Sequence, residues 1–344
     1  MIFVGMDIHD KSTTVCFFDP EAAPVAQHRY ATCPTTAKDL TALLRPFGGD
    51  CQIAYEVGTQ AQWVAGILRP LAEEVQVANP GQIRWLYRSG RKNDRLDAKK
   101  LATLLYLGQL PTVHLPSADV SAWRALINHR RTLVNRRTMV KNQIRAILRA
   151  FAARCPYRSC WSVRGVLWLR SQTFDAARDL MRDTLLAEMD FITGQLRHVE
   201  RQLDAIARTQ SNVALIRTIP GIGPRTAEAI VAFADQVGRF KHRKAFACYF
   251  GMTPTQDASG GRDHHGHISK QGPSVVRWVL TEAAHQTVRR CRALKDFYRR
   301  VHQGRKDRSK RAIVATGRKI LTLAFAMMRD QTVFDPSRVT ASAA

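Results

Sequence analysis

The sequence predicts an α/β N-terminal domain, a helical coiled-coil linker and a mainly helical C-terminal domain that contains a helix-hairpin-helix. Strand-like and helix-like segments alternate in the first third of the chain. Apolar residues then recur every seven positions, and a Pro-Gly turn precedes the last group of helices. We place the three parts at 1–116, 117–211 and 212–335, followed by a tail at 336–344.

The first third has the pattern of a mixed sheet. Apolar residues at 2–8, β-branched and aromatic residues at 13–18 and a more polar segment at 25–32 predict three successive strands, which favours an antiparallel meander. The elements expected next are a helix, a strand, a helix and a strand, at 36–44, 52–57, 60–72 and 75–78. This order is typical of a mixed α/β sheet.

Beyond Asp94 the pattern becomes helical. We expect helices at 94–107, 117–153 and 176–208. In the last two, apolar residues follow seven-residue or four-three spacing, which is typical of a coiled-coil seam. They are Leu126, Leu133, Val140 and Ile147 in one helix, and Leu185, Met189, Ile192, Leu196, Val199, Leu203 and Ile206 in the other. The seam fits an intramolecular hairpin and also pairing with another subunit.

A further helical unit begins near residue 212. The segment Pro220-Gly221-Ile222-Gly223, followed by Arg225, predicts a helix-hairpin-helix in which Gly221, Gly223 and Arg225 contact DNA or RNA. Its glycines permit a tight turn that leaves backbone N–H groups and a helix N-terminus available to a phosphate. A hairpin used only for packing is the alternative. We expect a polar loop at 255–272, helices from residue 274 and a loose tail over the last residues.

The charge of the chain favours a polyanionic partner. The 344 residues include 53 Lys and Arg but only 28 Asp and Glu, for a net charge of +25. Residues 1–90 hold 7 basic and 9 acidic residues, so the excess lies in the remainder, with thirteen basic residues at 289–319. Such a chain is expected to bind nucleic acid, because each neutralised phosphate releases counterions.

The sequence gives no indication of a membrane or secreted protein. No run approaches the roughly 18 apolar residues that span a bilayer, and the N-terminus lacks a secretion signal. The seven scattered cysteines form no CxxC pair, and Cys155 and Cys160 have no nearby histidines that would complete a zinc site. We therefore expect a cytoplasmic protein associated with the nucleoid and no membrane partner.

Four carboxylates occupy positions from which they can converge. Asp7 and Glu56 close predicted strands, and Asp94 and Asp97 lie three apart at the start of a helix, on one face. Acids brought together raise one another's pKa unless a divalent cation neutralises them, and Mg²⁺ prefers such an oxygen shell. For Asp94, a simple role as helix N-cap is the alternative.

The order of these acids resembles a known family. Gly5-Met6-Asp7, Tyr55-Glu56-Val57-Gly58 and Asp94-Arg95-Leu96-Asp97-Ala98 are similar to motifs of the DEDD insertion-sequence transposases, whose first domain is RNase H-like and similar to the RuvC resolvase. The resemblance implies that Asp7, Glu56, Asp94 and Asp97 form a catalytic tetrad that holds Mg²⁺ or Mn²⁺.

The resemblance extends to the C-terminal domain. There the family carries a serine that attacks DNA, and its motif matches Ser259 in Asp257-Ala258-Ser259-Gly260-Gly261. Ser269, beside Lys270, is the competing nucleophile. Positive charge for the pentavalent transition state is expected from Arg262, Lys270 or Arg277. Three histidines in this segment exceed the usual family pattern and are expected to be solvated, with no general base identified: His264, His265 and His267.

The resemblance also implies the partners: donor and target DNA, a structured noncoding bridge RNA that pairs with both, and a homodimer or homotetramer. Two rival functions stay open, a RuvC-like metal-dependent junction nuclease with a structural Ser259, and a junction-binding protein without catalysis. A covalent protein–DNA adduct separates the transposase from both. We further expect the serine and the carboxylates of different subunits to form one composite site.

Overall fold

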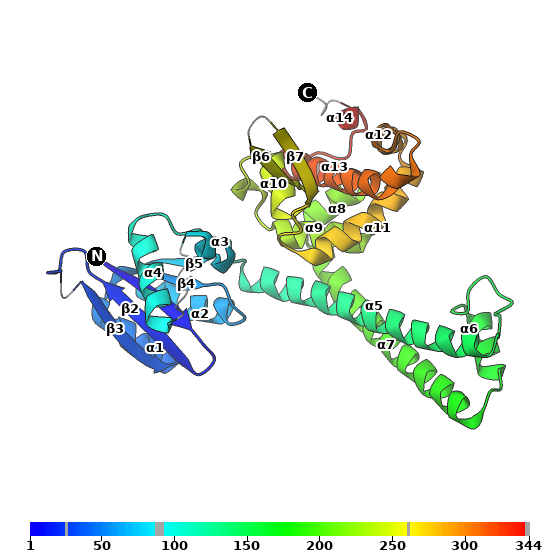
Figure 1. Ribbon diagram of the computed structural model, residues 1–344, viewed down its shortest axis with the longest axis horizontal. Coiled ribbons are helices and arrows are strands. Elements are labelled where there is room, and N and C mark those ends of the chain that lie inside the picture. The colour runs from blue at the N-terminus through cyan, green and yellow to red at the C-terminus, as the bar shows by residue number, and fades with distance from the viewer. Residues whose placement is uncertain (25–26, 87–92, 260–261, 341–344) are drawn as a thin grey trace. The chain divides into compact units, whose positions relative to one another are not determined.

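The computed structural model describes residues 1–24, 27–86, 93–259 and 262–340 (Figure 1). The chain divides into two compact units, 1–118 and 119–344. The first is built on a five-stranded sheet of order β3-β2-β1-β4-β5. Its strands are β1 Ile2–Ile8, β2 Ser12–Phe18, β3 His28–Pro34, β4 Gly49–Glu56 and β5 Ala72–Ala78.

Strand directions confirm the predicted mixed α/β, RNase H-like fold. β1 pairs antiparallel with β2, and β2 antiparallel with β3, which is the expected meander. β4 runs parallel to β1 on the other side, and β5 runs parallel to β4. β1 is therefore the central strand, and the carboxyl ends of β1 and β4 lie next to each other.

Helices cover both faces of this sheet. On one face, Val4 and Met6 of β1 share a core with Leu40 of α1 (Ala37–Leu44) and Val64 of α2 (Ala61–Leu68). On the other face lies α4 (Asp94–Tyr106), which contacts β1, β2 and β4. A short helix, α3 (Pro80–Leu86), follows β5.

The predicted helix at 60–72 was too long. α2 ends at Leu68 and a 3-10 turn occupies Arg69–Leu71, so that β5 begins at Ala72 instead of residue 75. Pro70 explains the early end, because its ring lacks an N–H donor and clashes with the preceding helical turn.

In the second unit, the two long predicted helices are α5 (Ala118–Ala150) and α7 (Ala176–Arg208), separated by α6 (Val163–Ser171). The seam residues Leu133, Val140, Met189 and Ile192 are buried in one core. Arg130 of α5 also forms an ion pair with Glu200 of α7, at 2.6 Å, which joins the two helices. α5 and α7 thus form the intramolecular hairpin that the spacing allowed.

The rest of the unit is mainly helical, as predicted. Its helices are α8 Ser211–Arg217, α9 Pro224–Ala234, α10 Arg243–Tyr249, α11 Ser274–Arg290, α12 Arg292–His302, α13 Ser309–Asp330 and α14 Ser337–Thr340. α8 and α9 pack together around the Pro-Gly turn. Val339 of α14 is buried, so the predicted tail includes a packed helix. No helix among the described residues is long and apolar enough to cross a membrane.

The prediction of a polar loop at 255–272 was wrong. Most of it is an antiparallel hairpin of β6 (Pro254–Ser259) and β7 (Arg262–Ile268). The strands are made largely of polar residues, so the apolar alternation that identifies a half-buried strand is missing from the sequence.

A buried ionic cluster joins α7 and α9. Arg225 of α9 forms ion pairs with Asp204 of α7 and, at 3.0 Å, with Glu228 of its own helix. Glu228 is fully buried, and neither of its carboxylate oxygens accepts a well-aligned hydrogen bond from the described residues. Burial, opposed by Arg225, raises the pKa of Glu228 to about 7.

Stability should therefore depend on pH through Glu228. The folded chain holds this proton more tightly than the unfolded chain, so the stability it contributes is present below about pH 4.5 and is lost as the pH rises through 7. Glutamine cannot ionise. Relative to Glu228→Gln, the wild type should lose up to about 3 kcal/mol between pH 5 and pH 8 in denaturant titrations. The exposed Glu282→Gln serves as control, and parallel pH profiles for all three chains would contradict the assignment.

Candidate active site

The active-site region depends on a close contact between α4 and β1. A Cβ atom on Gly5 would lie 2.0 Å from the carbonyl oxygen of Ala98 and 2.6 Å from the backbone nitrogen of Ala102. Ala98 and Ala102 are fully buried. Three small residues thus let the helix backbone rest directly on the central strand.

This contact brings acids from the strand and the helix together. Asp7 lies two residues beyond Gly5, so both point to the same face of β1. Asp94 lies one helical turn before Ala98, on the helix face that packs on the sheet. One ligand atom each from Asp7, His9 and Asp94 lies within 4.8 Å of the other two. The His9 Nε2 atom is 3.4 Å from Asp7 Oδ2 and 3.8 Å from Asp94 Oδ2.

Asp94 is not the N-cap of α4, which was the alternative to a site role. Asn93 is the cap, and its side chain accepts a hydrogen bond from the backbone N–H of Arg95 at 3.0 Å. The carboxylate of Asp94, about half exposed, is directed instead toward His9. Capping by the preceding residue thus leaves Asp94 available to a ligand.

Glu56 and Asp97 lie outside this three-residue group. Met6 is paired with Tyr55, so Asp7 and Glu56 follow at adjacent ends of parallel strands. Glu56 lines a small pocket of about 80 Å³ together with Asp10. Asp97 forms an ion pair with Lys100 at 2.9 Å.

His9 is the residue that the sequence interpretation missed. Its signal was the spacing Asp7-Ile8-His9 at the end of a strand, where residues two apart share one face. Two carboxylates and an imidazole fit a divalent cation, since carboxylates suit Mg²⁺ and Mn²⁺, and imidazole is compatible with Mn²⁺ more than with Mg²⁺.

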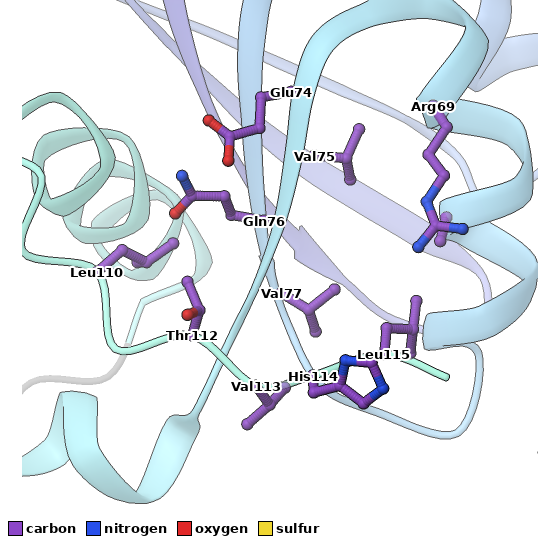
Figure 2. A pocket seen from close by; sticks show the side chains of 11 residues that line it. Arg69, Glu74, Val75, Gln76, Val77, Leu110, Thr112, Val113, His114 and Leu115 are labelled. Carbon is purple, nitrogen blue, oxygen red and sulfur yellow. The ribbon is translucent and has the colours of Figure 1, made fainter. Parts of the chain in front are cut away.

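A larger pocket of the first unit lies at β5, the edge strand of the sheet, and has different chemistry. It measures about 450 Å³ and is lined by Arg69, Glu74, Gln76 and His114, among others (Figure 2). Glu74 is the one carboxylate in the lining. With no second acid to join it there, this pocket is a poor candidate for the metal centre.

In the second unit, the backbone places Ser259 at the end of β6, opposite Arg262 at the start of β7. The side chains of residues 257–265 lie outside the described residues, and this includes the predicted nucleophile Ser259, Arg262, His264 and His265. His267 is exposed. The hydroxyl of the competitor, Ser269, is buried without a hydrogen-bond partner among the described residues.

Lys270 belongs to a turn that interlocks with residues 249–252. Its φ is +55°, and its backbone N–H donates to the carbonyl of Gly251 at 3.2 Å. A Cβ on Gly251 would lie 2.2 Å from the carbonyl oxygen of Gln271, so only glycine fits there. The side chain of Lys270 is exposed. The interlocked turns therefore hold an exposed cation next to the hairpin.

Two arginines that were predicted to contact nucleic acid, Arg277 and Arg225, form hydrogen bonds or ion pairs within the fold. Arg277 Nη1 donates to the carbonyl oxygens of Phe250, Gln271 and Gly272, at 3.2, 2.6 and 3.1 Å. Arg225 is held by the acidic pair described above. These guanidinium groups shape the loops from inside.

The predicted hairpin glycines have different surroundings. Gly221 has a φ of +96°, and a Cβ there would lie 2.7 Å from the backbone nitrogen of Thr287 in α11. Gly223 is exposed, and a Cβ would meet nothing within 4 Å. Gly221 therefore fixes the turn, while Gly223 leaves the backbone open at the start of α9.

Comparisons with known proteins find similarity to transposases in both units. Residues 4–152 match the family model of the DEDD transposases of IS110 type, and residues 213–299 match the IS116/IS110/IS902 transposase family. A probable family 20 transposase of Pseudomonas aeruginosa is 27% identical over 322 residues, which cover 91% of this chain and 94% of that protein. The transposase of element IS1328 of Yersinia enterocolitica is 25% identical, over 68% of this chain and 70% of its own length.

We predict that Gly5→Ala separates α4 from β1. The added methyl group meets backbone atoms that cannot yield without moving the helix, so the first unit should lose about 1–3 kcal/mol of stability. Asp94 should move with α4, which should weaken Mn²⁺ binding measured by calorimetry.

Gly66→Ala is the matched control on the other face of the sheet. Gly66 is exposed in α2, where a Cβ meets nothing within 4 Å, so this change should keep metal binding and gain up to about 1 kcal/mol. Wild-type metal affinity in Gly5→Ala would show that the contact does not position the site.

Proposed function

The chain belongs to the IS110 family of transposases, enzymes that break and rejoin DNA, and we propose that it does so through a phosphoserine intermediate under the guidance of a bridge RNA. The observation that best supports this function is the convergence of Asp7, His9 and Asp94 at the end of the central strand. A DEDD domain implies metal-dependent catalysis.

Asp7, Glu56, Asp94 and Asp97 would hold Mg²⁺ or Mn²⁺, with His9 as an additional ligand or neighbour. When bound, the ion supplies positive charge that stabilises the charge developing on the scissile phosphate. Lys100 holds the carboxylate of Asp97 by an ion pair at 2.9 Å. Ala98 and Ala102 of α4, packed on Gly5, fix the position of the helix backbone that carries Asp94 relative to the strand that carries Asp7.

Ser259 is the proposed nucleophile. Its Oγ loses its proton and forms a bond to phosphorus, and the bond from phosphorus to one strand oxygen breaks. That oxygen takes up one proton and leaves as a hydroxyl, so the step consumes no net proton. Attack by a hydroxyl of another strand reverses the step, so rejoining requires no ATP. Arg262 and the exposed Lys270 would stabilise the pentavalent phosphorus. Arg277 keeps the neighbouring turn in shape.

The partners follow from the family and the charge. Donor and target DNA would bind the basic second unit, with Gly223 offering open backbone and Gly221 and Arg225 fixing the turn beside it. The bridge RNA would pair with both DNAs, and residues 117–211 would link the metal domain to the serine domain. We propose a dimer or tetramer in which the carboxylates of one subunit act with Ser259 of another.

Trapping a covalent intermediate tests the serine. With matching guide RNA and nicked DNA, the wild type should form a protease-sensitive DNA adduct that Ser259→Ala lowers by about a thousandfold or more. Ser269→Ala should form it normally, since it removes only a buried hydroxyl. Magnesium-dependent cleavage that survives Ser259→Ala would support the nuclease instead.

Mixing variants tests the composite site. Asp7→Asn and Ser259→Ala chains should each be inactive, and co-refolded mixtures should regain part of the strand-transfer activity, measured by product quantification. A mixture as inactive as its parents would exclude action between subunits.

Purification without nuclease treatment, followed by sequencing of the nucleic acid that co-purifies, tests the guide RNA. Failure to recover a structured RNA would contradict guidance by RNA but leave the proposed serine chemistry intact.

A further inference from the structure

A basic pocket lies in the second unit, where the start of α10 meets α13. It measures about 450 Å³. Its charged lining consists of Lys241, Arg243, Lys319, Arg329, Arg338 and the acid Asp330. None of these residues belongs to the carboxylate site or to the serine hairpin.

The acid of this pocket is already neutralised. Asp330 accepts hydrogen bonds from Arg329 at 2.8 Å and from Arg338 at 3.1 Å. These bonds keep the pKa of the Asp330 carboxyl below its usual range. Within the described part of the chain, Lys241 and Lys319 have no acidic partner. The pocket thus carries an excess of positive charge.

A charged Lys319 is energetically unfavourable in this pocket. The residue is only 7% exposed, and burial together with repulsion from Arg243 and Arg300 lowers its pKa to about 8. Its ammonium lies 5.9 Å from the centroid of the Phe297 ring, near the outer limit for a cation–π contact. A buried cation without a counter-charge is unfavourable, and lysines are rarely buried in this way unless paired.

We propose that this pocket binds a phosphate group of nucleic acid, with the ammonium of Lys319 facing the phosphate oxygens. A phosphate supplies the negative charge that the lining lacks. Leu323 and Ala326 add an apolar wall, and the volume suits one phosphate with its sugar better than the side of a duplex. The site extends the proposed function. Binding of phosphate by the pocket does not depend on that function; only the assignment of the phosphate to nucleic acid does.

Thermal unfolding in inorganic phosphate tests the pocket itself, using the full chain freed of nucleic acid. Phosphate should raise the Tm of the wild type above its value in chloride at the same ionic strength, because a ligand of the folded state stabilises it. Lys319→Met should lose this shift yet be no less stable in chloride, since it removes an unpaired buried charge. Lys319→Arg should retain most of the shift.

Lys310→Met is the matched control, because Lys310 is exposed on the same helix and does not line the pocket. It should keep the phosphate shift. Equal shifts in Lys319→Met and the wild type, or equal stabilisation by chloride, would overturn the site. Asp7→Asn and Ser259→Ala should keep the shift, so its presence does not depend on recombination activity.

Fluorescence anisotropy with labelled single-stranded oligonucleotides tests the source. Affinity should fall about tenfold or more in Lys319→Met relative to Lys310→Met, as expected for one charge-assisted contact. A comparison of oligonucleotides with and without a terminal phosphate shows whether the pocket holds a terminal or an internal phosphate. Either result fits the proposal. Unchanged oligonucleotide binding beside a lost phosphate shift would assign the pocket to free phosphate and overturn the nucleic-acid source.

Discussion

The contact of α4 with β1 at Gly5 is the constraint on which the metal site depends. Two of the acids come from elements far apart in sequence, and their separation is set by how deeply the helix lies on the sheet. Ala98 and Ala102 let the backbone itself be the contact surface. Because backbone atoms have no rotamers, the separation of the backbones that carry Asp7 and Asp94 is fixed by the fold.

The first unit was predictable where local pattern and tertiary structure agree. Short runs of apolar, β-branched and aromatic residues predicted the strands, and strand ends predicted Asp7 and Glu56 as neighbours. Capping could not be assigned in the same way, because Asn93 and Asp94 are both good N-caps and only the backbone decides between them. His9 escaped for a related reason: a single histidine gains meaning only when α4 brings a carboxylate to it.

In the second unit, the partners and the burial of charged residues could not be predicted from the sequence. Sequence identifies an arginine but not its partner, so Arg225 and Arg277 were predicted to face phosphate while the structure engages them with Asp204, Glu228 and backbone carbonyls. Conversely, Lys319 was one of thirteen basic residues in a run, and only burial distinguishes it. The paired β6 and β7 were missed because polar strands carry no apolar period.

Pairing within the fold also separates two roles of positive charge. Ion pairs such as Arg225 with Asp204 hold helices together, and they use up much of the acid of the second unit. The remaining cations have too few acids to meet them in a chain of net charge +25, and their mutual repulsion works against the compact state. A polyanion that binds the folded chain reduces this repulsion and stabilises the fold by an amount that grows with its concentration relative to its Kd. The proposed binding of nucleic acid would therefore be linked to folding stability through electrostatics, independently of the proposed chemistry at the metal and the serine.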